Sequence, residues 1–453
     1  MTIEERPSMT HAEASEAGAA GDAAAAGDAE AAKTGMVSAF AHRDFTLLWS
    51  GQVLSAIGNQ MFPIILAILV LQRHSGAAGL GMILAVQGVA LALGMVLAAS
   101  IGDRWRRTRI MVSTDVVRGL GVAAIAISPL HVPLAAFIVF VIAIGIAEGM
   151  FLPAYGAVLP RVLPEAALQA GNGLTALSQY MAMVAGPLVA GLLVATAGAG
   201  PALWVDVITF AASIATLVLI KEPAEARAEA AAKQRAGIMR RGVADLAEGL
   251  RAVRERPWIA ASIGAATIVM TLVVAPAFLA APIVARQHFG GAAAYGAMFT
   301  ALGVGSIIGS LLGGRIRTRR PGLVAFTGVL TVAGSVSSLA FLPLPGILVF
   351  WAIAGIGVTI FQVLYSTALQ TEVPDRLLGR VMALDWLGSQ GLMPLGYALA
   401  GVVVGAIGIR DMLVAGAVLV LVVVPLPLLV RGGTTFSSRR PTGAGLPAAE
   451  PTA

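Results

Sequence analysis

The sequence predicts an all-α polytopic membrane protein with twelve transmembrane helices in two pseudo-symmetric six-helix bundles. Three observations predict this fold. The chain is 58% hydrophobic and only 12% charged, which is about half the charge of a soluble domain. Apolar runs of at least about 18 residues recur along it, each long enough to cross ~30 Å of hydrocarbon as a helix. A stretch of the second half also repeats a stretch of the first half at a fixed offset.

Twelve apolar segments can be placed, six in each half of the chain. They are residues 46–71, 78–101, 109–130, 133–157, 168–197, 201–220, 259–284, 293–314, 322–343, 346–369, 379–407 and 411–430. The first six predict an N-terminal bundle (41–221) and the last six a C-terminal bundle (258–431). Residues 1–40 lack the pattern of a signal peptide, and they and residues 432–453 are predicted to be disordered cytoplasmic tails.

The positions of the basic residues predict the orientation in the membrane. If both termini are cytoplasmic, cytoplasmic segments hold 26 of the 30 Lys and Arg, and the opposite loops hold only Arg73, Arg286 and Arg410. Cytoplasmic loops carry such an excess in membrane proteins. The bias therefore explains the net charge of +6 without a nucleic-acid partner. The preference for Arg over Lys suggests a GC-rich bacterial genome, so we expect a bacterial inner (plasma) membrane.

A charged segment, residues 222–257, joins the two predicted bundles. Its second part places four apolar residues at helical spacing with charged residues between them: Val243, Leu246, Leu250 and Val253. This pattern predicts an amphipathic helix that lies at the cytoplasmic interface.

The two halves resemble each other at an offset of 210 residues. Six residues of the first half, Gly145, Ile146, Phe151, Tyr155, Pro164 and Leu174, recur as Gly355, Ile356, Phe361, Tyr365, Pro374 and Leu384. Parallel repeats of this kind place a substrate site at their interface near the bilayer midplane, and the halves rock around it. The repeat therefore favours a transporter over a membrane sensor.

The chain resembles a major facilitator superfamily transporter over about residues 40–431. The family's signature G-x-x-x-D-R-x-G-R-R matches "ASIGDRWRRTR", which keeps Asp103, Arg104 and Arg107. That stretch and "RDFTLLWSGQVLSAIGNQMF" are similar to the macrolide-efflux and siderophore-export branch. The resemblance implies that this loop locks the two halves on the cytoplasmic side. Asp385, near the start of the eleventh span, could then pair with Arg104 or Arg107.

A second family motif, G-x8-G-x3-G-P-x2-G-G, is typical of exporters that exchange substrate for protons. Its positions are filled here by Gly173, Ala182, Gly186, Pro187, Ala190 and Gly191. Small residues allow two membrane helices to approach closely, and a proline bends a helix. The match implies a tightly packed seam. The alternative is that these small residues only pack one Gly-rich helix.

Ionisable residues inside the membrane are functional candidates because their burial is costly. Arg118 and Glu148 lie at one predicted depth, nine residues from the cytoplasmic ends of the third and fourth spans, and Asp115 is one turn from Arg118. We therefore predict an Asp115–Arg118–Glu148 cluster with Glu148 as the proton carrier. The alternative is a static salt bridge between two helices. Asp206 is expected to reach the outer interface.

Polar and aromatic residues in the spans suggest a cavity for a bulky amphiphilic molecule. The candidates are Asn59, Gln179, Gln362, Phe151, Phe361 and Tyr365. Few polar side chains are available, so a sugar site is disfavoured. A phosphate site would need a free central arginine, whereas Arg118 is expected to engage carboxylates.

The sequence thus predicts a secondary active transporter that exports an amphiphilic antibiotic, drug or metabolite, in exchange for protons, by alternating access. An importer or uniporter on the same fold is the alternative, with a non-transporting sensor less favoured. The chain has no cysteine, no histidine cluster and no G-x-x-x-x-G-K-[ST] loop. We therefore expect no metal, no cofactor, no enzyme activity and no ATP-driven transport. A monomer is expected as the default oligomeric state.

Overall fold

The computed structural model describes residues 36–73, 76–101, 105–220 and 248–437. Its first half consists of η1 (Met36–Ala41), α2 (Arg43–Gln72), α3 (Gly76–Ile101), α4 (Arg107–Ile127), α5 (Leu134–Val162), α6 (Glu165–Ala197) and α7 (Ala199–Val218). Its second half consists of α10 (Pro257–Val269), η2 (Met270–Val274), α11 (Ala275–His288), α12 (Ala292–Gly313), α13 (Pro321–Val329), α14 (Thr331–Phe341), α15 (Leu344–Glu372), α16 (Asp375–Trp386), η3 (Leu387–Gly391), α17 (Met393–Val423) and α18 (Leu426–Leu429).

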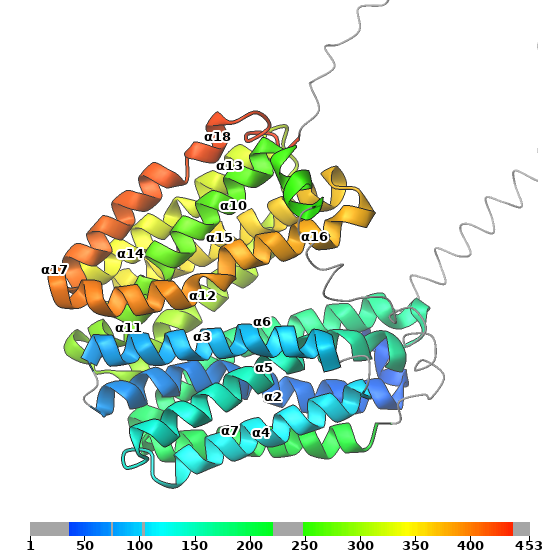
Figure 1. Cartoon of the computed structure of the whole chain (residues 1–453), viewed down its shortest axis with the longest axis vertical. Helices are drawn as coiled ribbons and strands as arrows, with labels where there is room; N and C mark the ends of the chain where they lie inside the picture. The colour runs from blue at the N-terminus through cyan, green and yellow to red at the C-terminus, as the bar shows by residue number, and fades with distance from the viewer. Residues whose placement is uncertain (1–35, 74–75, 102–104, 221–247, 438–453) are drawn as a thin grey trace, which may run out of the picture.

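The predicted helical membrane fold is confirmed. Eleven helical stretches of the described chain are long and apolar enough to cross a membrane. The last of them, Arg376–Leu429, contains two spans, because the chain turns back inside α17 at Gly408, with φ 82° and ψ 165°. Figure 1 shows α17 folding back at this point. The twelve spans of the sequence prediction are therefore all present as helices.

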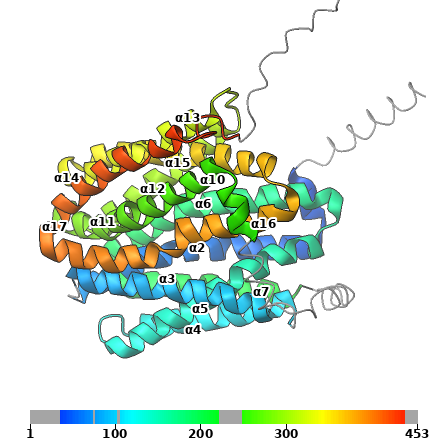
Figure 2. The same cartoon turned by 45° about the horizontal axis from the view of Figure 1, so that its top comes forward.

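The helices form two groups, one from each half of the chain (Figure 1). Within the first group α3 packs on α5, α4 packs on α5 and α7, and α2 packs on α6 and α7. The second group repeats this order, with α12 on α15, α14 on α15 and α17, and the α10–α11 stretch on α17 and α18. Between the groups, α3 packs on α17 and α6 packs on α12, and Figure 2 shows both pairs side by side. The groups meet near α11 and diverge towards α16 (Figure 1); these ends are called the α11 side and the α16 side below.

The internal repeat appears in the backbone as well as in the sequence. Gly198, between α6 and α7, has φ 93° and ψ 174°, nearly the values of Gly408 in the second half. Only glycine adopts this region readily, because it has no Cβ. Gly145 and Gly355, also 210 residues apart, allow the close pairing of α5 with α3 and of α15 with α12.

Two spans of the second half contain a π-helical turn. η2 joins α10 to α11 within the seventh span, and η3 joins α16 to α17 within the eleventh span. The two turns contact each other. Such turns are rare and occur often at functional sites, because they leave part of the backbone hydrogen-bonding out of register.

The second half continues in ordered structure beyond the expected boundary at residue 432. Phe436 is buried, and its ring lies 5.1 Å from that of Trp258, measured between centroids. The expectation of disorder is thus wrong for 432–437, because an apolar side chain anchors this segment. Residues 438–453, and 1–35 at the other end, lie outside the described part of the chain.

The described part of the predicted linker helix spans residues 248–254. Of its two predicted apolar residues in this range, Val253 is buried, whereas Leu250 is 49% exposed. The buried side continues through Ala252, and Glu248 forms an ion pair with Arg380 of α16. The ion pair between Glu248 and Arg380 therefore joins this helix to α16, and Ala252 and Val253 are buried. Leu250, which the sequence placed on the same apolar face, is not.

Candidate functional site

An ion pair lies inside the first group of helices. Arg118 and Asp115, one turn apart on α4, have exposed fractions of 1% and 0%, and the Nη2 atom of Arg118 donates a hydrogen bond to Oδ1 of Asp115. Residues three apart share one face of a helix. The predicted spacing thus places both charges together, away from water and lipid.

Hydrogen bonds extend from this pair to two further helices. The hydroxyl of Ser213 on α7 donates to Oδ2 of Asp115 at 2.6 Å, and it accepts a hydrogen bond from Gln52 Nε2 on α2 at 2.9 Å. Arg118 Nη1 donates to Oδ1 of Asn59, also on α2, at 2.9 Å. The pair therefore cross-links α2, α4 and α7. Asn59, expected in a substrate cavity, belongs to this network instead.

Two aromatic rings sandwich the guanidinium of Arg118. Its central carbon lies 4.5 Å from the ring centroid of Phe151 on α5 and 4.8 Å from that of Phe210 on α7. A cation over an aromatic face is stabilised by about 2 kcal/mol or more when water is excluded. Phe151, which was also expected in the substrate cavity, thus packs against the guanidinium of Arg118.

Glu148 on α5 is not a direct partner of Arg118, which corrects the predicted cluster. It forms no ion pair and no hydrogen bond with any described residue, although it lies within electrostatic range of Arg118. Asp115 and Asn59 accept the hydrogen bonds of the two terminal nitrogens, and Nε of Arg118 has no hydrogen-bond partner in the described part of the chain. Glu148 is also partly exposed, whereas Asp115 is fully buried.

Asp206 on α7 is a further carboxyl of this network that sequence reasoning missed. Its exposed fraction is 0%, so the expectation that it reaches an interface is wrong. Asp206 interacts electrostatically with Arg118 and Glu148, and its Oδ2 atom has no hydrogen-bond partner in the described part of the chain. The available signal was its position, seven residues inside a span of only 20 residues.

The resulting site, here called the carboxyl network, contains Asp115, Glu148 and Asp206 around the single cation Arg118. One guanidinium balances one carboxylate, so two carboxyls lack a countercharge among these four residues. Unpaired charge is costly in a membrane interior. The four residues therefore gather more carboxyl groups than cations inside the first group of helices.

A cavity lies inside the second group of helices. Its inner part has a volume of about 330 Å³, and its lining includes Met183 of α6, so it reaches the boundary between the groups. A smaller cavity of about 100 Å³ continues it, sharing Met270 and Gln390 of the two π-turns. Three of the expected cavity residues line the smaller part: Phe361, Gln362 and Tyr365. Gln179, expected here as well, is exposed on α6.

The comparisons with known proteins agree with this architecture. The Major Facilitator Superfamily profile matches residues 48–384. The chain belongs to the major facilitator superfamily. It is 29% identical over 390 residues to the multidrug efflux pump Tap of Mycolicibacterium fortuitum, covering 83% of this chain and 90% of Tap. The chain is 21% identical over 393 residues to macrolide efflux protein A of Streptococcus pyogenes, and the match covers 85% of this chain and 95% of that protein.

Solved structures of the superfamily share the fold. The nucleoside transporter NupG superimposes with a TM-score of 0.66 at 12% sequence identity, covering 85% of this chain and 99% of that structure. Together with the apolar helices, these findings establish a multi-pass membrane transporter of the superfamily.

The family's cytoplasmic lock motif is only partly described by the structure. Asp103 and Arg104 lie outside the described residues, and Arg107 is partly exposed at the start of α4. Asp385, assigned to the lock by resemblance, accepts a hydrogen bond from Tyr365 of α15 at 2.9 Å, and its expected pairing with Arg104 lies outside the described residues. It forms no ion pair with any described residue, and it lines the smaller cavity.

The family's exporter motif lies where α6 meets two other helices. A Cβ on Gly186 would come within 2.5 Å of the Cβ of Gln60 on α2. A Cβ on Gly191 would lie 3.1 Å from the Cα of Gly296 on α12. Ala182 is fully buried, whereas Gly173 is partly exposed nearer the α16 side. The small residues therefore permit close contact of α6 with α2 in its own group, at Gly186, and with α12 of the other group, at Gly191.

Gly296→Ala is expected to disrupt this seam. The added Cβ would lie 2.3 Å from the carbonyl oxygen of Pro187, so one helix must move. Overpacking of this kind costs about 1–3 kcal/mol, and we expect a lower unfolding temperature in detergent and a transport rate reduced several-fold. Gly264→Ala is the matched control, since nothing lies within 4 Å of its added Cβ. Equal stability and transport of the two variants would contradict the close packing.

Proposed function

We propose that this transporter exports small amphiphilic molecules across the bacterial inner membrane in exchange for protons, by alternating access, with no enzymatic reaction. The observation that carries the proposal is the pairing of two unlike sites. The first half holds the carboxyl network, which can carry protons, and the second half holds the largely apolar cavity, which can hold substrate. The named efflux activities of the relatives support export over import.

The α16 side is proposed to face the cytoplasm, as the positions of Lys and Arg predicted. The close contacts between the groups lie towards the α11 side, where Gly81 and Gly191 meet α17 and α12. We therefore assign this structure to a state that is closed towards the outside and able to load substrate from the inside.

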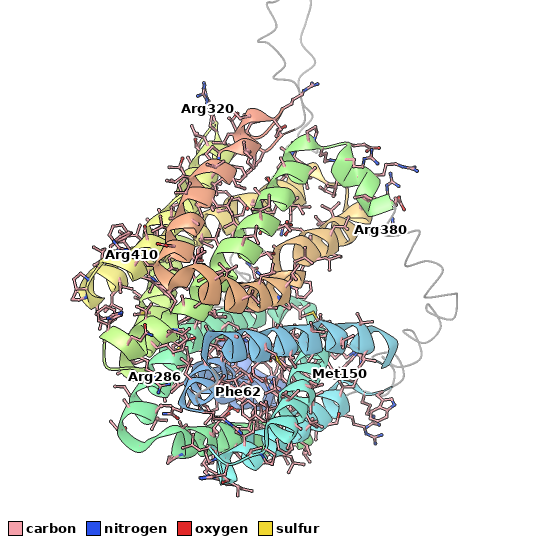
Figure 3. The ribbon with its side chains drawn as sticks, turned by 60° about the vertical axis from the view of Figure 1, so that its left-hand side comes forward. Phe62, Met150, Arg286, Arg320, Arg380 and Arg410 are labelled. Carbon is pink, nitrogen blue, oxygen red and sulfur yellow. The ribbon has the colours of Figure 1, made fainter. Side chains whose placement is uncertain are left out.

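One of the hydrogen bonds between the two groups joins α11 to the end of α2. Arg286 Nη1 donates to the carbonyl oxygen of Leu71, at the end of α2. Carbonyls at a helix C-terminus lack helical partners and attract cations. Figure 3 shows Arg286 on the same side of the molecule as Arg410, but Arg410 stacks on Phe341 within the second group.

Arg286→Ala is expected to favour opening of the α11 side. A hydrogen bond from a charged group contributes about 1.5–3 kcal/mol, so the open population should rise roughly tenfold or more. The chain has no cysteine, so a single Ile283→Cys, at a position 8% exposed, can be labelled with an impermeant maleimide. Labelling should accelerate with Arg286→Ala and stay unchanged with the control Arg410→Ala; equal rates in both would contradict the proposed closure.

The proposal is tested by efflux from a bacterium that lacks its own pumps. Cells expressing the transporter are loaded with macrolides, dyes and lipophilic cations, with a protonophore added to half of the samples. We expect lower accumulation of at least one compound and loss of this effect with the protonophore. Higher accumulation would indicate an importer, and efflux that survives the protonophore would contradict proton exchange.

A further inference from the structure

The cavity of the second group contains one acidic side chain, Asp385, which is not part of the carboxyl network and whose expected pairing with Arg104 lies outside the described residues. Asp385 lines the smaller cavity together with the π-turn residues Met270 and Gln390. Oδ1 of Asp385 accepts the hydrogen bond from Tyr365, whereas its Oδ2 has no hydrogen bond or ion pair to any described residue. Asp385 is partly exposed, and carboxylates within membrane spans normally pair with cations or accept hydrogen bonds. One side of this carboxylate is thus open to the cavity.

The internal repeat shows that the fold does not need a carboxylate at this position. The residue 210 positions earlier is Thr175, and Tyr155, the counterpart of Tyr365, lies 3.4 Å from its hydroxyl. The same tyrosine therefore meets a neutral hydroxyl in the first half and a carboxylate in the second. A threonine at position 385 would satisfy the tyrosine without adding charge, so the charge itself needs another explanation.

The surroundings of Asp385 are those of a site for an organic cation. No lysine or arginine in the described part of the chain pairs with it, in contrast to Asp115, which Arg118 neutralises. Three aromatic rings line the same cavity, and Phe361 stacks on Tyr365 with 5.2 Å between ring centroids. Aromatic faces attract cations, most strongly where water is excluded. The remaining lining is mostly apolar, which excludes small hydrated cations.

The two π-turns give this cavity its polar edge. η3 carries Ser389 and Gln390 into the lining, opposite Met270 and Val274 of η2. Gly388 lets η3 approach α10 closely, since a Cβ there would lie 2.7 Å from the side chain of Ile263. The π-helical turns η2 and η3 thus line the same cavity as the carboxylate of Asp385, the aromatic rings and the side-chain amides of Gln362 and Gln390.

We propose that Asp385 is the anionic anchor of a binding site for hydrophobic organic cations, formed in the second group of helices by α10, η2, α13, α15, α16 and η3. The cation lies against the aromatic rings of Phe361 and Phe326, and its apolar substituents extend into the larger cavity towards Met183. This inference rests on the proposed export function for its role in transport. Binding itself requires no proton gradient.

The test is equilibrium binding to the purified full-length protein in detergent, without any gradient. The probes are methyltriphenylphosphonium and its neutral analogue triphenylphosphine oxide. The variants are Asp385→Asn, Asp385→Thr and the control Asp411→Asn, an exposed acidic residue of α17. Unfolding temperatures show which variants are folded, and Asp385→Thr, which reproduces the first-half arrangement, serves if Asp385→Asn is unstable.

We expect the wild type and Asp411→Asn to bind the cation equally, and both Asp385 variants to bind it at least about tenfold more weakly, since a lost charged contact is worth about 1.5–3 kcal/mol. Binding of the neutral analogue should not change. The proposal is overturned if the wild type does not bind the cation or if the folded Asp385 variants bind it normally. It is also overturned if the Asp385 variants bind the cation and the neutral analogue equally more weakly than the wild type does. Cation binding that persists while efflux fails would sink the export proposal and leave the site intact.

Discussion

Exchanging Arg118 for methionine is expected to abolish transport and to destabilise the protein by about 3–5 kcal/mol, the usual cost of leaving a buried charge without its partner. Asp115 would remain fully buried, and Asn59 would lose its donor. Methionine has similar length, so the change removes charge and hydrogen bonds more than volume. The measurements are the unfolding temperature in detergent and efflux from cells.

The double variant Asp115→Asn with Arg118→Met separates a structural role from a transport role. It removes both charges, and replacing a buried ion pair by neutral groups is often nearly neutral for stability. We expect it to recover most of the unfolding temperature and none of the transport. Arg118→Lys should also fail, because an ammonium cannot serve Asp115 and Asn59 in the planar geometry of a guanidinium. Recovery of transport in the double variant would show that the pair only holds helices together.

Glu148→Gln is expected to eliminate proton-driven efflux while leaving substrate exchange. Glu148 is the member of the carboxyl network without a direct partner and with partial exposure, so it can meet water and exchange a proton. Glutamine has the same shape but holds no exchangeable charge, and the protein should remain folded. Efflux from cells should fall to the background, whereas exchange of labelled for unlabelled substrate across proteoliposomes should persist.

Asp44→Asn is the matched control for this variant. Asp44 lies at the start of α2 next to Arg43, far along the helix from the carboxyl network. Its removal should affect neither efflux nor exchange. Normal efflux by Glu148→Gln would move proton coupling to Asp206 or Asp115.

Much of the fold could be predicted because a membrane imposes simple rules on sequence. Apolar length predicted the twelve spans, and Gly198 and Gly408, 210 residues apart, adopt nearly the same φ and ψ in the structure. The position of Asp115 one turn from Arg118 on a single helix gave their pairing directly. Such features depend on local spacing, which a sequence states explicitly.

The rest depends on how helices rotate and pair, which spacing does not state. Depth alone suggested that Glu148 contacts Arg118, but the side chain that accepts the hydrogen bond of Arg118 Nη1 is Asn59 of α2. The π-turns η2 and η3 change the hydrogen-bond register without changing the apolar pattern. At the proposed cation site the sequence repeat does show a difference, because Thr175 of the first half corresponds to Asp385 in the second half.

We propose that protons and substrate move in opposite directions through this one carrier. The direct measurement is proton flux in proteoliposomes that contain a trapped pH dye, after addition of a compound that the efflux assay identifies, with the membrane potential clamped. We predict a proton flux that requires the compound, runs against its movement, and disappears with Glu148→Gln but not with Asp44→Asn. Movement of the compound with no accompanying proton flux in the wild type would contradict the account.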